Sequence, residues 1–309
     1  MARMRIAVVG TGGVGGYFGG RLAAAGADVS FLARRDHLAA LRTTGLTIQS
    51  PKGDVHISRV TATDDPVAIG PVDVVLFTVK LYDIAAAITL LPPLLGPDTA
   101  VIPLQNGVDS VDIVRRAVGP SHAAGGTCYV SAVIAEPGVI RHTAMDHLIF
   151  GELDGSRSLR LERLLEACKP TGFQSTLSAN ITVDIWTKFT RLSVFSGMTA
   201  VTRCAIGTIV NDSELFDMLK AAVGEALAVA HAKGIGVPGD IARDVARAYA
   251  ALPPNAKASM LEDLERGRRL ELPWLSGAVV RIGREVGVPT PIHSFIATVL
   301  KPHVNGAAG

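Results

Sequence analysis

The fold is decided by the N-terminal sequence Arg5-Ile6-Ala7-Val8-Val9-Gly10-Thr11-Gly12-Gly13-Val14-Gly15. An apolar run precedes the pattern G-x-G-x-x-G and a helical pattern follows it, which is the arrangement of a dinucleotide-binding loop. Gly10 permits the tight turn, Gly12 lets the backbone approach a pyrophosphate, and Gly15 lets the helix pack closely on the strand. We predict that a dinucleotide binds to Gly10, Thr11, Gly12, Gly13, Val14 and Gly15. A glycine-rich turn without a ligand is the alternative.

The residues after the second predicted strand indicate which dinucleotide binds. Asp28–Leu32 has the apolar pattern of a buried strand, and Arg34 follows it closely. An NAD site has a carboxylate here to accept from the ribose hydroxyl, whereas an arginine suits the 2′-phosphate of NADP. Asp36 is expected to be the N-cap of the next helix. We therefore predict NADP(H), with a solvated helix start as the alternative explanation of Arg34.

Two further strand ends carry polar side chains. Lys80 follows the predicted strand Val72–Val79, and Asn106 follows the predicted strand Thr99–Leu104. Ligands of doubly wound sheets bind at the carboxyl ends of the strands. We expect Lys80 to contact a cofactor phosphate, although a lysine at the rim is the alternative. Asn106 is expected at the nicotinamide end, although Asn-Gly is first of all a turn signal.

Length and composition favour two domains and argue against nucleic-acid and membrane partners. The chain has 309 residues, of which 48% are hydrophobic, enough for two cores. The formal net charge of +2 and the aromatic content of 5% argue against nucleic-acid binding. No apolar run is long enough to span a bilayer. We expect a cytoplasmic protein.

The spacing of cysteines and histidines argues against disulfides and metal sites. Cys128, Cys168 and Cys204 are far apart and form no C-x-x-C pair, which fits a reducing cytosol. The eight histidines have no metal-ligand spacing. We therefore expect no metal.

The pattern of the sequence changes in its second half. Strand signals disappear there and helical periodicity begins, as at Ile181, Ile185 and Phe189. We expect an α/β Rossmann-type doubly wound sheet domain that binds NADP at 1–179, followed by an all-α C-terminal domain at 180–309 that holds the substrate and the catalytic residues. Apolar helix faces are compatible with a homodimer as well as with a core within one chain.

The chain resembles the ketopantoate reductase (2-dehydropantoate 2-reductase) family over both halves. The resemblance rests on the Gly10–Gly15 loop, Arg34, Val79-Lys80, Gln105-Asn106-Gly107, Pro137–Thr143, Trp186-Thr187-Lys188, Ser259–Leu261 and Asp263–Glu271. It implies a Rossmann domain followed by a helical domain. It also implies the NADPH-dependent reduction of a 2-oxo acid, in the first place ketopantoate to pantoate in pantothenate biosynthesis.

The resemblance also implies roles for individual residues. Lys188 would be the general acid that protonates the carbonyl oxygen, with Glu271 as a hydrogen-bonding partner on the substrate side. Ser259 would contact the substrate, and Asn106 would hold the nicotinamide and the substrate in register. An ammonium group beside a carbonyl stabilises the developing alkoxide and supplies its proton. Without the resemblance, Lys188 and Glu271 would be interpreted as solvated surface residues.

This chain departs from the family pattern at two positions of the implied substrate site. The family has asparagines four and eight residues after the lysine, where this chain has Leu192 and Ser196. A polar substrate group left unpaired in a closed site costs about 1–3 kcal/mol. Leu192 therefore favours a different, more apolar 2-oxo acid as the alternative substrate. The alternative from another class is a non-catalytic NADP(H)-binding regulator.

Overall fold

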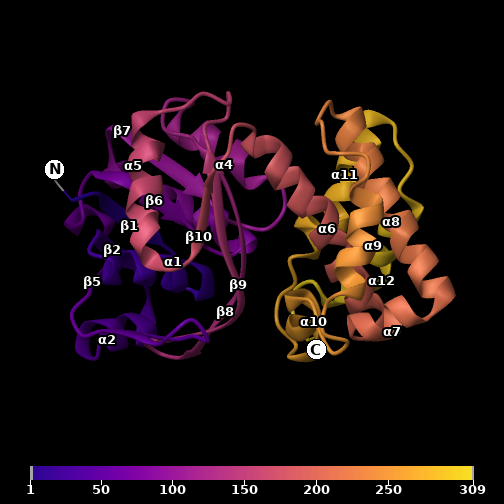
Figure 1. Ribbon diagram of the computed structural model, residues 1–309, viewed down its shortest axis with the longest axis horizontal. Helices are drawn as coiled ribbons and strands as arrows, with labels where there is room; N and C mark the ends of the chain where they lie inside the picture. The colour runs from indigo at the N-terminus through magenta and orange to yellow at the C-terminus, as the bar shows by residue number, and fades with distance from the viewer. Residues whose placement is uncertain (1–2, 308–309) are drawn as a thin grey trace. The chain divides into compact units, whose positions relative to one another are not determined.

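The computed structural model describes residues 3–307, and the chain forms two compact units (Figure 1). One unit comprises Met1–Gln105 and Asp109–Ile181, and the other comprises Asn106–Val108 and Thr182–Gly309. Each unit has its own hydrophobic core. The short segment Asn106–Val108 thus packs with the helical unit, although the strand before it belongs to the first unit.

The first unit contains a parallel five-stranded sheet. Its strands are, in spatial order, β5 (Thr61–Thr63), β2 (Asp28–Leu32), β1 (Arg5–Val9), β6 (Val72–Phe77) and β7 (Leu95–Pro103). Every neighbouring pair is parallel, and β1 and β6 are almost entirely buried, as expected when both faces of a sheet are covered. The chain order reverses between β1 and β6, which is where doubly wound sheets bind ligands. The predicted Rossmann-type sheet is confirmed.

Helices connect and cover these strands. They are α1 (Gly13–Ala24), α2 (Arg35–Thr43), α3 (Ile84–Ala87), α4 (Ser110–Val118) and α5 (Leu159–Cys168). The prediction that Asp36 caps α2 is wrong, because Arg34 occupies the N-cap position and Asp36 lies in the first helical turn. Arg34 has extended backbone dihedrals, so the chain enters the helix immediately after it. Asp36 instead lies near the positive end of the helix dipole.

A second sheet is built mainly from the segment after α4. Its strands are, in order, β10 (Gln174–Leu177), β9 (Val139–Gly151), β3 (Leu46–Gln49) and β4 (Val55–Ile57), and β8 (Gly125–Glu136) pairs with β9. β3 and β4 form an antiparallel hairpin. Parallel pairing of β3 with β9 places this hairpin in the second sheet.

Helix α1 packs closely against both sheets because glycines occupy several of its contact positions. On one side, a Cβ atom added at Gly19 would lie 2.6 Å from the side chain of Val8 in β1. On the other side, a Cβ atom added at Gly16 would lie 2.7 Å from the side chain of Ile140 in β9. Both distances are too short for carbon atoms in contact. An alanine at either position would therefore push the helix away from one of the sheets.

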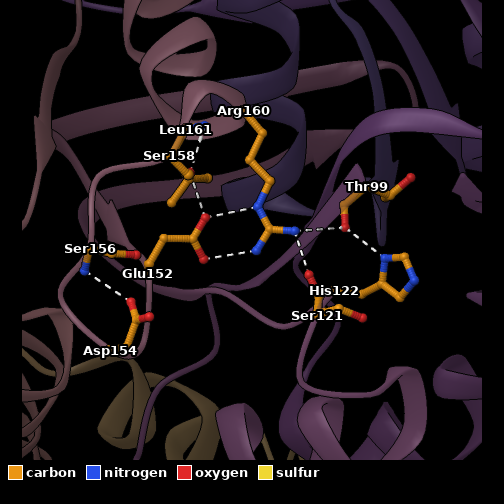
Figure 2. A network of polar contacts seen from close by, with 9 residues as sticks. All are labelled: Thr99, Ser121, His122, Glu152, Asp154, Ser156, Ser158, Arg160 and Leu161. Atoms are coloured by element: carbon orange, nitrogen blue, oxygen red, sulfur yellow. Dashed lines mark hydrogen bonds and ion pairs between the residues drawn. The ribbon is translucent and has the colours of Figure 1, made fainter. Parts of the chain in front are cut away.

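A largely buried ion pair attaches the end of β9 to α5 (Figure 2). The Arg160 guanidinium donates from Nε and Nη2 to the two oxygens of Glu152, each at 2.8 Å, and from Nη1 to the carbonyl of Ser121 at 2.6 Å. Ser158, the N-cap of α5, donates to the same carboxylate at 2.5 Å. Burial alone would raise the pKa of Glu152, but the hydrogen bonds from Arg160 and Ser158 outweigh it and lower the pKa. Glu152 is therefore ionised at neutral pH and fully engaged by its neighbours.

The second unit is helical, as predicted. Its helices are α6 (Ile181–Thr202), α7 (Ile206–Asn211), α8 (Ser213–Ala232), α9 (Ile241–Ala250), α10 (Ser259–Glu265), α11 (Ser276–Val286) and α12 (Pro291–Leu300). Ile185 and Phe189, which the periodicity of the sequence places on one face of α6, are both buried. Within residues 3–307, no helix is both long enough and apolar enough to cross a membrane.

Helix α12 is held on α8 by a glutamate and a histidine. Glu225 of α8 accepts hydrogen bonds from the backbone N–H groups of Ile292 and His293 at 2.9 and 3.1 Å, and so caps the N-terminus of α12. The His293 ring is completely buried, with Nε2 at 3.1 Å from the carbonyl oxygen of Ala222. Burial lowers the pKa of His293 to about 4. The ring is therefore neutral at pH 7 and donates its Nε2–H to that carbonyl.

We expect His293 to make folding stability fall as the pH drops from 6.5 towards about 4. In this window the unfolded chain binds a proton at the histidine and the folded chain does not. The contribution of buried His293 to the free energy of unfolding is therefore complete above pH 6.5 and is progressively lost as the pH falls below that value. The slope from one histidine is at most ~1.4 kcal/mol per pH unit. Urea unfolding of the wild type and of His293→Gln across this window measures the difference. Identical pH slopes for the two proteins would contradict the prediction.

Candidate functional site

The glycine loop has the geometry of a phosphate-binding turn. Gly10 has a φ of +98°, and a Cβ atom added there would lie 2.8 Å from Val79 Cγ1, so only glycine suits this position. Gly15 lies so close to the Thr78 side chain that a Cβ atom would collide with it. By contrast, a Cβ atom at Gly12 would have no atom of the other described residues within 4 Å, its two chain neighbours aside. The packing of the protein does not require a glycine at this position, whereas the close approach of a pyrophosphate does.

The loop leads into the N-terminus of α1, where backbone N–H groups are available to an anion. Gly12 is the N-cap residue, and no side chain of the described residues caps the helix. The N–H group of Gly16 bonds to the carbonyl of Gly12 at 2.7 Å, which leaves the N–H groups of Gly13, Val14 and Gly15 without partners inside the helix. These groups and the positive end of the helix dipole fit the phosphates of a dinucleotide.

Two threonines hold the loop, and sequence reasoning missed one of them. Thr11 donates from its backbone N–H and from Oγ1 to the carbonyl of Leu32 at the end of β2, at 3.2 and 2.9 Å. Thr78, directly after β6, donates from Oγ1 to the carbonyl of Gly10 at 2.7 Å. A single threonine at a strand end has no motif of its own, so its only sequence signal is its place between a buried strand and Lys80.

The cations predicted to bind cofactor phosphates follow the two strands that flank β1. Arg34 follows β2 and is exposed, and its side chain makes no hydrogen bond or ion pair within the described part of the chain. Arg35 has a φ of +53°, a conformation that costs a residue with a side chain about 1–2 kcal/mol. Lys80 is exposed after β6 and directly follows Val79, which contacts Gly10.

His37 joins α2 to the turn between β8 and β9. Its Nδ1 accepts a hydrogen bond from the backbone N–H of Gly138 at 3.0 Å. Burial lowers the pKa of His37, so the ring is neutral at pH 7 and its proton lies on Nε2. The positive charge at the start of α2 therefore comes from Arg34 and Arg35 and not from His37.

In the helical unit, Asn106 brings Lys188 and Glu271 together. Lys188 of α6 donates from Nζ to Asn106 Oδ1 at 3.0 Å, and Asn106 donates from Nδ2 to Glu271 Oε2 at 3.0 Å. Lys188 is half-buried and Glu271 is only 6% exposed. The amide is fixed by a cation at its oxygen and an anion at its nitrogen, so a flip would cost both hydrogen bonds. Three predicted site residues from distant parts of the sequence are therefore adjacent.

Gly107 fixes the position of Asn106. Its φ is +83°, and a Cβ atom added there would lie 2.8 Å from the carbonyl oxygen of Trp274, just after Glu271. A larger residue would strain the backbone and push apart the two segments that carry Asn106 and Glu271. The sequence indicates a turn at this Asn-Gly pair, but the close approach of Trp274 has no signal in the sequence.

The remaining predicted substrate residues differ in accessibility. Leu192, one turn after Lys188 on α6, is half-buried and packs against the helical core. Ser196, one turn further, is 1% exposed, and its Oγ has no hydrogen-bond partner among residues 3–307. Ser259 is the exposed first residue of α10. The contact of these three residues with a substrate stays a prediction.

The chemistry available in the helical unit is that of an ammonium group with a fixed direction. Lys188 can donate a proton and attract an anion, and Asn106 and Glu271 hold it in place. Among residues 3–307, no cluster of three or more His, Cys, Asp or Glu side chains is arranged to hold a metal ion.

Both halves of the chain match one protein family. Residues 6–155 match the family described as Ketopantoate reductase PanE/ApbA. Residues 180–304 match the family described as Ketopantoate reductase PanE/ApbA C terminal. The two matches follow each other in the order of the two units.

Individual relatives extend this similarity over nearly the whole chain. A 2-dehydropantoate 2-reductase of Mesorhizobium japonicum is 31% identical over 96% of this chain and 97% of its own. An uncharacterized oxidoreductase of Bacillus subtilis, YkpB, is 29% identical over 94% of this chain and 95% of its own. The crystal structure of a PanE/ApbA family ketopantoate reductase from Ralstonia eutropha JMP134 matches with a TM-score of 0.89 at 30% identity, over 97% of this chain and 98% of that one. The chain therefore belongs to the ketopantoate reductase family and is an oxidoreductase that acts on a CH–OH group with a nicotinamide cofactor.

Proposed function

We propose that this protein uses NADPH to reduce a 2-oxo acid to a 2-hydroxy acid, with 2-dehydropantoate (ketopantoate) as the leading substrate. The observation that carries the proposal is the hydrogen-bonded group of Lys188, Asn106 and Glu271, which fixes an ammonium group in a defined direction. The Mesorhizobium japonicum relative is named for the reduction of 2-dehydropantoate. With this substrate the product is pantoate, and the protein serves pantothenate biosynthesis.

Lys188 has the chemistry that the carbonyl oxygen of the substrate needs. Bound NADPH would supply a hydride to the carbonyl carbon, which leaves negative charge on the oxygen. The Lys188 ammonium stabilises this charge and gives the oxygen its proton, so that a hydroxyl group results. Asn106 accepts a hydrogen bond from Nζ and keeps it in place, and Glu271 keeps the Asn106 amide in place. The same ammonium attracts the carboxylate of the 2-oxo acid.

The charges around the glycine loop favour NADPH over NADH. The open space at Gly12 and the N–H groups at the start of α1 fit the pyrophosphate. Arg34 is exposed, its guanidinium has no partner among the described residues, and it occupies the place where an NAD site has a carboxylate. Its planar guanidinium suits the 2′-phosphate of NADP. Lys80 supplies a second cation at the strand on the other side of β1.

A different, more apolar 2-oxo acid is the second candidate substrate, and Leu192 favours it. Leu192 lies one turn after Lys188 and offers no hydrogen-bonding group. A hydroxyl of the substrate that met Leu192 in a closed site would lose its hydrogen bonds to water without replacement. The reaction would be the same, because Lys188, Asn106 and Glu271 do not depend on the residue at this position.

Gly12→Ala tests whether the open space beside the loop is the cofactor site. Apart from its two chain neighbours, the added methyl group meets no described residue within 4 Å, so the free energy of unfolding should change by less than about 1 kcal/mol. The KM for NADPH should rise by about tenfold or more, because the methyl group occupies the space of the pyrophosphate. The matched control is Gly13→Ala, whose methyl group would collide with the carbonyl of Ala132 and destabilise the protein without cofactor. An unchanged KM in Gly12→Ala would refute the assignment.

Arg34→Ala tests the preference for NADPH. Loss of a charge-assisted contact should weaken NADPH binding by roughly 10- to 100-fold and leave NADH binding unchanged. Steady-state kinetics with both cofactors measure the ratio. Arg42→Ala on the same helix removes an exposed arginine that pairs with Asp64, and it should alter neither cofactor. A similar loss of NADPH and NADH binding in Arg34→Ala would show that Arg34 does not contact the 2′-phosphate.

Lys188→Met and Lys188→Arg together test the general acid. Lys188→Met should lower kcat by about 10²- to 10⁴-fold while NADPH binding, followed by fluorescence titration, stays unchanged. Lys188→Arg keeps the positive charge, but a guanidinium does not release its proton to the substrate, so kcat should stay low while the substrate KM recovers. A Lys188→Met enzyme with nearly normal kcat would remove Lys188 from the proposed chemistry.

A panel of 2-oxo acids, assayed by NADPH oxidation, tests the substrate. We expect ketopantoate to have the highest kcat/KM, and Leu192→Asn to shift the ratio further towards hydroxyl-bearing acids by roughly 5- to 150-fold. If ketopantoate ranks near the bottom while an apolar 2-oxo acid ranks first, the second candidate is correct. If no 2-oxo acid is turned over, the proposed reaction is wrong.

A further inference from the structure

The turn that carries two arginines into α2 has a strained backbone. Arg35 has a φ of +53°, in the left-handed region. Neither Arg34 nor Arg35 makes a side-chain hydrogen bond or ion pair with any residue that the structure describes. A conformation of this kind persists only where the contacts on both sides hold the chain in place. The contacts that fix this turn therefore decide where Arg34 presents its guanidinium.

On one side, the end of β2 holds the turn. Thr11 of the glycine loop donates from its backbone N–H and from Oγ1 to the carbonyl of Leu32, at 3.2 and 2.9 Å. The N–H of the next residue, Ala33, donates to the carbonyl of Thr63 in β5 at 3.1 Å. The chain is thus fixed up to the residue before Arg34, and this side of the turn is tied to the glycine loop itself.

On the other side, the turn is held by His37, three residues after Arg34. Nδ1 of His37 accepts a hydrogen bond from the backbone N–H of Gly138, in the turn between β8 and β9, at 3.0 Å. The carbonyl of Gly138 accepts from the N–H of Thr47 in β3 at 2.9 Å, so this anchor is itself fixed in the second sheet. A Cβ atom added at Gly138 would lie 3.1 Å from the Cβ of Ala40, which shows how closely the turn packs on α2.

The second nitrogen of His37 faces the interior of the protein. Nε2 is buried and makes no full hydrogen bond within residues 3–307. The Thr11 backbone acts on the ring as a weaker partner, because it raises the pKa of His37 against the larger effect of burial. The neutral ring keeps the lone pair on Nδ1 that the Gly138 N–H requires. His37 therefore joins the glycine loop, the start of α2 and the β8–β9 turn.

We propose that His37 is a positioning residue for the cofactor, which fixes the strained turn so that Arg34 meets the 2′-phosphate of NADPH. This inference rests on the proposed function, because Arg34 must be the residue that contacts this phosphate. His37 acts through Arg34 and not by touching the cofactor. Without the hydrogen bond to Gly138, the turn relaxes towards an unstrained conformation and the guanidinium moves away. The alternative is that His37 only attaches α2 to the second sheet, in which case its loss lowers stability and leaves the preference for NADPH unchanged.

Dissociation constants of NADPH and NADH, measured by fluorescence titration, test the inference. His37→Leu should weaken NADPH binding about fivefold, as expected for one hydrogen bond, and leave NADH binding and the kcat at saturating NADPH unchanged. His37→Asn places Oδ1 where Nδ1 lies in the histidine, and should restore most of the NADPH affinity. The matched control is His147→Leu, which removes a histidine that hydrogen-bonds Thr176 in the same unit and should bind both cofactors as the wild type does.

A double-variant cycle shows whether His37 acts through Arg34. In an Arg34→Ala background, His37→Leu should change NADPH binding by less than about twofold. Unchanged NADPH binding in His37→Leu, an equal loss of NADPH and NADH binding, or a fivefold loss that persists without Arg34 would overturn the inference and leave the proposed cofactor intact. A wild type that binds NADPH and NADH equally well would overturn the proposed cofactor preference and this inference with it.

Amide hydrogen exchange in the wild type gives a readout that needs no variant. Saturating NADPH should slow the exchange of the Gly138 N–H, which donates to His37, more than saturating NADH does. The reason is that only NADPH has the phosphate that the turn would hold. Equal protection of this N–H by both cofactors would contradict the positioning role.

Discussion

The first unit depends on glycines at the positions where α1 meets its two sheets. The helix has a sheet on each side, and at Gly16 and Gly19 the neighbouring side chains come closer than a Cβ atom would allow. Added methyl groups in such packing cost about 1–3 kcal/mol each. The second sheet is therefore more than an addition to the Rossmann sheet, because it presses α1 against β1. Because α1 is fixed, the glycine loop at its start is fixed as well, and hydrogen bonds from Thr11 and Thr78 hold the loop further.

The second unit depends on a polar constraint of a different kind. Glu271 is almost completely buried, and a buried carboxylate must be paired and hydrogen-bonded to be tolerated. Asn106 provides one of these hydrogen bonds with its amide N–H. Its amide oxygen, held in place by that contact, accepts a hydrogen bond from Lys188. One amide thus serves both groups, since its nitrogen donates to Glu271 and its oxygen accepts from Lys188. Stability and the proposed catalysis rely on the same two hydrogen bonds, and Gly107 lets the chain come close enough to form them.

The sequence predicted the features that local patterns encode. The strand, glycine loop and helix at the N-terminus and the helical second half all have periodic or turn signals within a few residues. Tertiary contacts have no such signal. Asn106 and Glu271 are 165 residues apart, and only the family resemblance linked them. The N-cap of α2 was assigned to Asp36 by residue preference, but the extended conformation at Arg34 decided the helix start. The role of Thr78 and the contact of Gly107 with Trp274 require the fold to be known.

Helix α6 shows how the substrate could change without a change in chemistry. Lys188, Leu192 and Ser196 follow one another at intervals of four residues and so share one face of the helix. Tyr249 contacts α6 at Arg191 and Phe195, which directly precede Leu192 and Ser196 in the sequence. The backbone of α6 is therefore held independently of the side chain at 192. An exchange there alters what the helix offers to a substrate, while Lys188 keeps its distance to Asn106. On the proposed function, an exchange at 192 can therefore change the substrate while Lys188, Asn106 and Glu271 keep their hydrogen bonds.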